Sequence, residues 1–112
     1  MRVENIPIVT NGNMASTITS TPIRLDWSLG VSVQAVWVNG GSAPNGNMSL
    51  QASLDGINWT VMPSTTLPVP NTASTQNNMW NIPDIFYNWI QFIWVPTSGS
   101  GTLQVRLNSK GQ

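Results

Sequence analysis

The sequence contains no cysteine and no histidine, and only four basic and four acidic residues. The missing cysteines exclude thiol catalysis and cysteine-ligated metals, although they say nothing about the redox compartment. Acid–base catalysis needs several titratable groups brought together, and this chain offers few. No basic cluster provides the electrostatic footprint that nucleic-acid binding requires. No apolar run approaches the length of a membrane-spanning helix. We therefore expect a non-enzymatic protein that uses no cofactor and binds neither nucleic acid nor membrane.

The few charges also bear on self-association. Charged residues make up 7% of the chain and their formal charges cancel, whereas roughly 25% is typical of soluble domains. Asn, Ser, Thr, Gly and Gln supply the polarity instead, and a neutral surface of this kind gives little repulsion between copies. We expect a homo-oligomer, with a trimer favoured.

A chain of 112 residues is large enough to bury a core as a single domain without a metal or disulfide. Met1 runs into charged residues and not into the apolar segment of a secretion signal. We therefore expect one domain over residues 1–112 that is made in a cytoplasm and does not leave by a standard signal. Residues 1–12 alternate weakly around Pro7, which predicts either an extended N-terminal arm or an edge strand.

Residues 86–95 are the richest in apolar and β-favouring side chains, which predicts a central strand. Ile90, Phe92 and Trp94 fall on one face, while Trp89 and Ile93 fall on the other. Because neither face is cleanly polar, both must be covered. A second sheet is expected on one face, and a loop, a neighbouring subunit or a ligand on the other.

Strict alternation predicts further strands over residues 30–38, 48–54 and 102–108, the last forming a hairpin with the central strand. Shorter strands are expected at 59–61, 66–69 and 79–82. No window has a helical period. The class is therefore all-β, an antiparallel, jelly-roll-like β-sandwich of about seven to nine strands with no significant helix.

The four carboxylates leave two kinds of functional site to consider, a catalytic pair and a calcium site. Two of them could flank a cleft as in a glycosidase, or Asp55 and Asp84 could bind Ca²⁺ with loop carbonyls. The simpler interpretation is that Asp55 forms a turn with Gly56 and that Asp84 caps the chain entering the central strand. We assign no catalytic and no metal-binding residue.

Two segments resemble known proteins. The stretch Ser53-Leu-Asp-Gly-Ile-Asn-Trp59 is similar to a hairpin found in discoidin-like domains, carbohydrate-binding modules and phage virion β-sandwiches. The segment from Ile82 to Leu103, closed by Lys110-Gly111, resembles small tailed-phage virion proteins in its Tyr87-Asn-Trp89 strand and its Pro96-Thr-Ser-Gly-Ser-Gly turn. The resemblance covers about half of the chain. It implies a virion component such as a capsid cement or decoration protein, or part of a head fibre or tail.

We accordingly expect a phage virion structural protein that oligomerises and bridges capsid proteins, with the major capsid protein or another virion protein as partner. Its contacts would come from the second face of the central strand, the N-terminal segment and the proline-containing loop. The candidate interface residues are Tyr87, Trp89, Gln91, Ile6, Ile8, Pro68 and Pro70.

The alternative is a carbohydrate-binding or receptor-binding module on a phage tail or fibre. The chain has six tryptophans, and an exposed tryptophan either stacks on a sugar ring or anchors a protein interface. Trp59 and Trp80 are the candidate glycan contacts. The competing interpretation is that nearly all six tryptophans are in the core or cover it.

Overall fold

The computed structural model describes residues 2–25, 28–62, 65–69, 77–82 and 87–111. Within them the chain forms strands and turns, and no helix is long or apolar enough to cross a membrane. The strands are β1 (Arg2–Asn13), β2 (Ile18–Thr19), β3 (Ile23–Arg24), β4 (Ser28–Asn39), β5 (Asn45–Ser53), β6 (Thr60–Val61), β7 (Leu67–Val69), β8 (Asn77–Ile82), β9 (Trp89–Ser98) and β10 (Gly101–Gly111).

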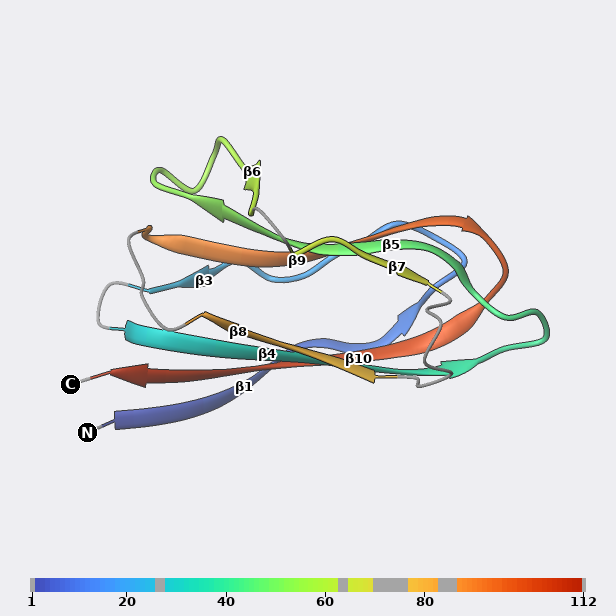
Figure 1. Ribbon diagram of the computed structural model, residues 1–112, viewed down its shortest axis with the longest axis horizontal. Helices are drawn as coiled ribbons and strands as arrows, with labels where there is room; N and C mark the ends of the chain where they lie inside the picture. Colours follow the sequence, from blue (N-terminus) through green and yellow to red (C-terminus); the bar gives the residue numbers. More distant parts are fainter. Residues whose placement is uncertain (1, 26–27, 63–64, 70–76, 83–86, 112) are drawn as a thin grey trace.

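The strands form two antiparallel sheets that pack face to face (Figure 1). The first sheet, here called sheet A, has the order β1-β10-β4-β8, and the second, sheet B, has the order β2-β9-β5-β6. In sheet B, β3 also pairs with β9 and β7 also pairs with β5. If β2 with β3 and β6 with β7 are counted as one broken strand each, the strand positions run 1-8-3-6 and 2-7-4-5. That is the order of a jelly roll, so the predicted fold class is confirmed.

In this topology most connections cross from one sheet to the other. The predicted hairpin between residues 86–95 and 102–108 is therefore wrong, because β9 lies in sheet B and β10 in sheet A. The turn between them is held against the loop after β4. The amide of Ser100 donates to the carbonyl of Ser42 (2.9 Å) and the amide of Gly40 donates to the carbonyl of Ser100 (3.0 Å). The hairpin predicted around Asp55-Gly56 is present, since β5 pairs with β6 within sheet B.

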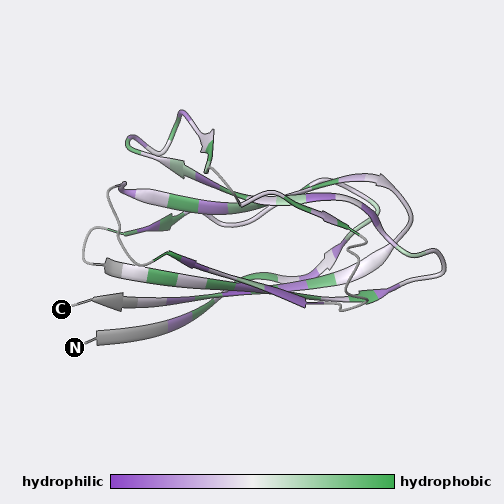
Figure 2. Ribbon diagram, in the orientation of Figure 1, coloured by the Kyte–Doolittle hydropathy of each residue, from purple (hydrophilic) through white to green (hydrophobic). Residues whose placement is uncertain are grey.

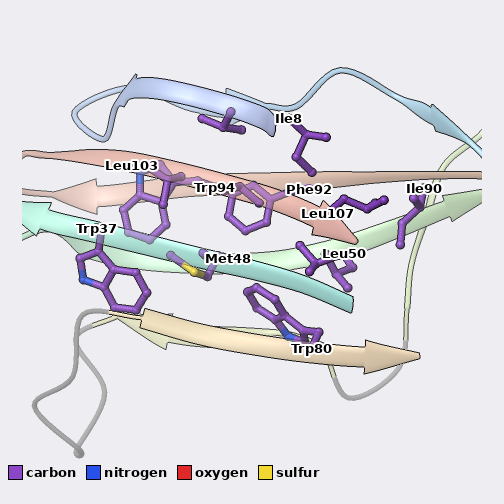
Figure 3. Close-up of a cluster of buried hydrophobic side chains, with 14 of the residues drawn as sticks. Ile8, Trp37, Met48, Leu50, Trp80, Ile90, Phe92, Trp94, Leu103 and Leu107 are labelled. Carbon is purple, nitrogen blue, oxygen red and sulfur yellow. The ribbon is translucent and has the colours of Figure 1, made fainter. Parts of the chain in front are cut away.

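The core lies between the sheets and follows the alternation of the sequence. Figure 2 shows this alternation along β4 as green bands between white and purple ones. Figure 3 shows side chains from both sheets meeting in the interior, with the ring of Trp80 approaching that of Phe92. Their centroids lie 6.0 Å apart at an interplanar angle of 62°, an edge-on contact typical of buried aromatic pairs. The fully buried side chains include Trp94, Phe92, Met14, Met48, Leu50, Ile90, Leu103, Leu107, Val33 and Val105.

The N-terminal segment is an edge strand of its own sheet and not a free arm. β1 pairs with β10 along its length, and its register shifts between Pro7 and Val9 and again between Val9 and Gly12. A proline is tolerated there because, among the described strands, β1 pairs with β10 alone. Ile8 and Val9 are buried in the core, so this segment contributes side chains to the packing between the sheets.

Candidate functional site

The outer face of β9 was the sequence-based candidate for the interface, and the chain itself covers much of it. Trp89 is half-buried, and the guanidinium of Arg24 lies 5.3 Å from its ring centroid. Gln91 is only 7% exposed, and its Nε2 donates to Oε1 of Gln51 on the paired strand at 2.7 Å. The structure therefore brings Trp89 and Gln91 together on one face. Neither side chain presents a large free surface.

The turn between β5 and β6 is held by one carboxylate. Oδ1 of Asp55 accepts hydrogen bonds from the amides of Asn58 (2.8 Å) and Ile57 (2.9 Å), and Oδ2 accepts one from the Asn58 side chain (2.7 Å). These donors, the Asn58 amide first, hold the pKa of the Asp55 carboxyl well below its ordinary value. The contribution of these hydrogen bonds to the stability of the fold is thus complete at neutral pH. It is lost only as the pH falls below the ordinary carboxyl range toward the lowered pKa of Asp55.

The same turn lies against the start of β9. Gly56 has a φ of +77°, a conformation that glycine adopts at little cost. A Cβ at this position would approach the ring of Trp89 to 3.1 Å. The Asn88 amide and side chain donate to the carbonyls of Ser53 (3.1 Å) and Leu54 (3.2 Å). Trp89 is therefore the ring against which the turn packs, and Trp59, within the same hairpin, is half-buried.

The rigid turn carries two of the most exposed apolar side chains among the described residues. Leu54 is 69% exposed and Ile57 is 79% exposed. The strand predicted over residues 48–54 includes Leu54, but β5 ends at Ser53 and the alternation ends with it. We call this projecting segment, residues 53–60, the hairpin tip; in Figure 1 it stands out from sheet B.

A hollow of about 380 Å³ lies beside the hairpin tip. Its walls combine polar groups with apolar surface, from Asp55, Asn58, Thr60, Ser53, Leu54, Ala52 and Tyr87. The Tyr87 hydroxyl is buried and has no hydrogen-bond partner among the described residues. Burial disfavours the charged tyrosinate and raises the pKa of Tyr87 to about 12.

Tyr87 is the only tyrosine of the chain, so its ionisation can be followed without ambiguity. Ultraviolet absorbance should show a native midpoint near pH 12, against about 10 for the unfolded chain in denaturant. Because the pKa of Tyr87 is higher in the native state than in the unfolded chain, the stability linked to its protonated hydroxyl is complete below about pH 10. That stability is lost as the pH rises toward 12. A native midpoint equal to that of the unfolded chain would show that the hydroxyl is solvated.

The other predicted residues are scattered. Ile6 is half-buried and Pro68, on β7, is exposed, while Pro70 lies outside the described residues. Ile8 belongs to the core, so its side chain is not available to a partner. Trp80 is also a core residue, and its indole Nε1 donates to the carbonyl of Thr65 at 2.9 Å. Its role as an exposed sugar platform is therefore wrong.

Sheet A exposes aliphatic side chains that were not among the predicted site residues. Val36, Val38 and Met79 are all exposed. Val36 and Val38 lie on the outer face of β4, together with the exposed Gln34. The signal that could have identified them is the run of valines on both faces of residues 31–38.

The described residues hold no group of three or more side chains of the types that ligate metals. The oxygens of Asp55 are committed to its own turn. Asp84, the other residue of the calcium hypothesis, lies outside the described part of the chain.

Comparison with known proteins shows the fold. No protein-family model matches the sequence, and no curated protein matches it. Among solved structures, the chain is similar to YomS, a protein derived from the SPBc2 prophage, with a TM-score of 0.63, 11% identity and coverage of 97% of this chain and 96% of that one. It is also similar to a chain of the Triatoma virus empty capsid (TM-score 0.53, 10% identity, 97% and 87% coverage).

A chain of infectious bursal disease virus, Gx strain, gives a TM-score of 0.53 at 16% identity; the match covers 98% of this chain but only 32% of the viral one. At such identities the likeness is one of fold.

Proposed function

We propose that this protein is a non-enzymatic structural component of a virus particle, most specifically a phage capsid cement or decoration subunit that oligomerises and bridges capsid proteins. The observation that carries the proposal is that nearly the whole chain is one jelly roll, similar along its length to a prophage-derived protein and to a viral capsid chain. A fold alone does not determine a function, so the surface chemistry must support it.

The surface favours binding through contact area. The described residues offer no metal-ligand cluster, and the Asp55 carboxylate is used by its own turn. With a net charge of zero, the protein gains little from long-range attraction. Its remaining means of attachment are shape, hydrogen bonds and apolar burial.

The hairpin tip is the best anchor for a capsid protein. Leu54 and Ile57 project from a turn that hydrogen bonds and the Trp89 ring already hold in place. Such a preorganised loop loses little entropy on binding. Complete burial of each side chain contributes about 1.5–3 kcal/mol. A partner with an apolar hollow would therefore gain substantially from these two residues.

The proposed location is the virion, after synthesis in the host cytoplasm, with the major capsid protein or another virion protein as partner. Self-association is part of the proposal, because uncharged copies do not repel one another. The sequence favours a trimer, whereas the edge strand β8 discussed below favours a two-fold dimer, and the native mass decides between them.

Attachment to purified particles tests the proposal. Because few charges take part, the fraction of protein retained should change less than about threefold between roughly 0.05 M and 0.5 M salt. The double variant Leu54→Ser with Ile57→Ser should bind about tenfold more weakly or worse, since it removes apolar area. Val95→Ser, which alters an exposed valine on another part of sheet B, is the matched control and should bind normally.

Absence of the protein from purified particles would overturn the proposed function. A steep loss of binding as the salt concentration rises would show that attachment is electrostatic and not apolar. Equal binding by the double variant and the wild type would remove the hairpin tip from the interface.

The alternative function, glycan or receptor binding on a tail or fibre, has one observation in its favour. The hollow beside the hairpin tip places a carboxylate, an amide and a hydroxyl near the Tyr87 side chain, a combination suited to sugars. Trp59 lies within the same hairpin and is half-buried. Binding on a glycan array that is lost in Asn58→Ala and Trp59→Ala, by a protein absent from capsids, would favour this function over the first.

A further inference from the structure

β8 is an edge strand without the features that usually protect an edge. In the part of the chain that the structure describes, it pairs with β4 and with no other strand. Its six residues, Asn77–Ile82, include no charge, no proline and no glycine. The unpaired amides and carbonyls of such an edge are a template for another strand, and proteins normally block it with lysine, proline, bulges or shortness.

The other described edges carry these blocks. β1 contains Pro7 and shifts its register twice. β2, β3 and β6 are two residues long, and β7 is three residues long with Pro68 at its centre. Thus β8 is the long, regular and unblocked edge among the strands described.

The outer face of sheet A changes character toward β8. On β10, Gln104, Arg106 and Asn108 make it polar. On β4 and β8, Val36 (42%), Val38 (64%) and Met79 (51%) expose apolar side chains. The register places Val36 opposite Asn77, next but one to Met79 along β8. An apolar patch therefore borders the open edge, and both would be covered by the same partner.

We infer that β8 pairs antiparallel with β8 of a second copy across a two-fold axis, which joins the two four-stranded A sheets edge to edge. This deepens the proposed function, on which it rests, by naming the surface through which copies meet. A second copy fits because a two-fold interface must be self-complementary, and a strand without charge does not repel itself. In this pairing the outer faces of the two A sheets lie on the same side. Residues on the outer face of one β8 therefore stand opposite outer-face residues of the other, so Met79 meets Met79, Asn77 or Asn81 of the partner copy.

A single edge strand gives a small interface, well below the roughly 800 Å² per partner of a stable complex. We therefore expect weak pairing between free chains. On a particle, neighbouring attached copies are held at mM effective concentrations, where weak pairing becomes substantial. Self-association should accordingly be measured up to about 1 mM.

Cross-linking provides a direct test, because the natural chain has no cysteine and any disulfide in a single-cysteine variant must join two chains. Met79→Cys, Asn77→Cys and Asn81→Cys are tested singly and in pairwise mixtures under mild oxidation. At least one combination should form a dimer, since directly opposite Cα atoms lie within disulfide range, and the reactive combination gives the register. Val95→Cys, equally exposed but on sheet B, is the control and should not cross-link.

Sedimentation provides the second test. Met79→Lys places like charges together across the axis and should weaken dimerisation about tenfold or more. Val95→Lys makes the same charge change on the other sheet and should leave it unchanged. Circular dichroism of each variant establishes that it is folded.

The outcomes separate this inference from the proposed function. If Met79→Lys and Val95→Lys weaken association equally, or if no cross-link forms between β8 strands, the β8 pairing is overturned. The protein would still be a self-associating virion component. A trimer as the smallest assembly also overturns it, because two-fold pairing cannot close three copies. A monomer up to 1 mM without cross-links overturns it as well, and particle attachment then decides the function independently.

Discussion

Replacing Trp94 with alanine is expected to lower the free energy of unfolding by about 4–5 kcal/mol, near the upper end for large-to-small core substitutions. Trp94 is fully buried and stands opposite Met48 on one side and Ile18 on the other. Its indole Nε1 donates to the carbonyl of Met14 at 2.9 Å. The substitution therefore leaves a cavity between the sheets and an unsatisfied carbonyl. Urea denaturation measures the loss, against a total stability of about 5–15 kcal/mol.

Two further variants separate the contributions. Trp94→Phe keeps most of the apolar volume but removes the donor, and should cost less than the alanine variant. Val95→Ala changes the adjacent, exposed position and should cost at most about 0.5 kcal/mol. A small effect of Trp94→Ala would mean that the sheets close over the space, and that the core does not depend on this ring.

Replacing Gly99 with alanine is expected to destabilise the protein by about 3 kcal/mol or more, because two penalties coincide. Gly99 has a φ of +84°, which side chains other than glycine adopt at a cost. A Cβ there would also collide with the backbone of Ala43 and come within 2.9 Å of the Pro44 Cα. Because this turn carries the chain from sheet B to sheet A, neither segment can shift independently. Thermal unfolding should show a melting temperature lower by about 10 °C or more.

Gly41→Ala is the matched control, since a Cβ at Gly41 would meet nothing within 4 Å. Its effect should stay within about 0.5 kcal/mol. If both glycine variants had the melting temperature of the wild type, the contact between the two loops would be dispensable. The connection from sheet B to sheet A would then be held by the strands alone.

The tryptophans are mostly part of the sandwich, which changes the basis of the proposed assembly. Trp37, Trp80 and Trp94 are core residues, and Trp89 and Trp59 are half-buried; Trp27 lies outside the described residues. The interface that we propose therefore uses exposed aliphatic side chains instead, at the hairpin tip and beside β8. The shortage of charged residues still favours self-association, because weak repulsion between copies is a property of the surface and does not depend on where the tryptophan rings lie.

The sequence by itself determined which residues face the core. In β4 the alternation of Val31, Val33, Ala35 and Trp37 with polar or exposed neighbours is a local property, and it survives any choice of sheet partner. The Asp55-Gly56 turn was equally predictable, because a carboxylate two and three residues before free amides closes it with local hydrogen bonds.

Only the tertiary structure decided which strands pair. The glycine-rich turn after β9 permits either a return within sheet B or a crossing to sheet A, and local chemistry does not choose between them. The crossing is fixed by contacts distant in sequence, such as the Ser100 amide on the Ser42 carbonyl. The edge position of β8 among the described strands and the cover over Trp89 arise in the same way. Edge position and burial of a strand's second face depend on which neighbours the whole chain supplies, and alternation along one strand carries no information about them.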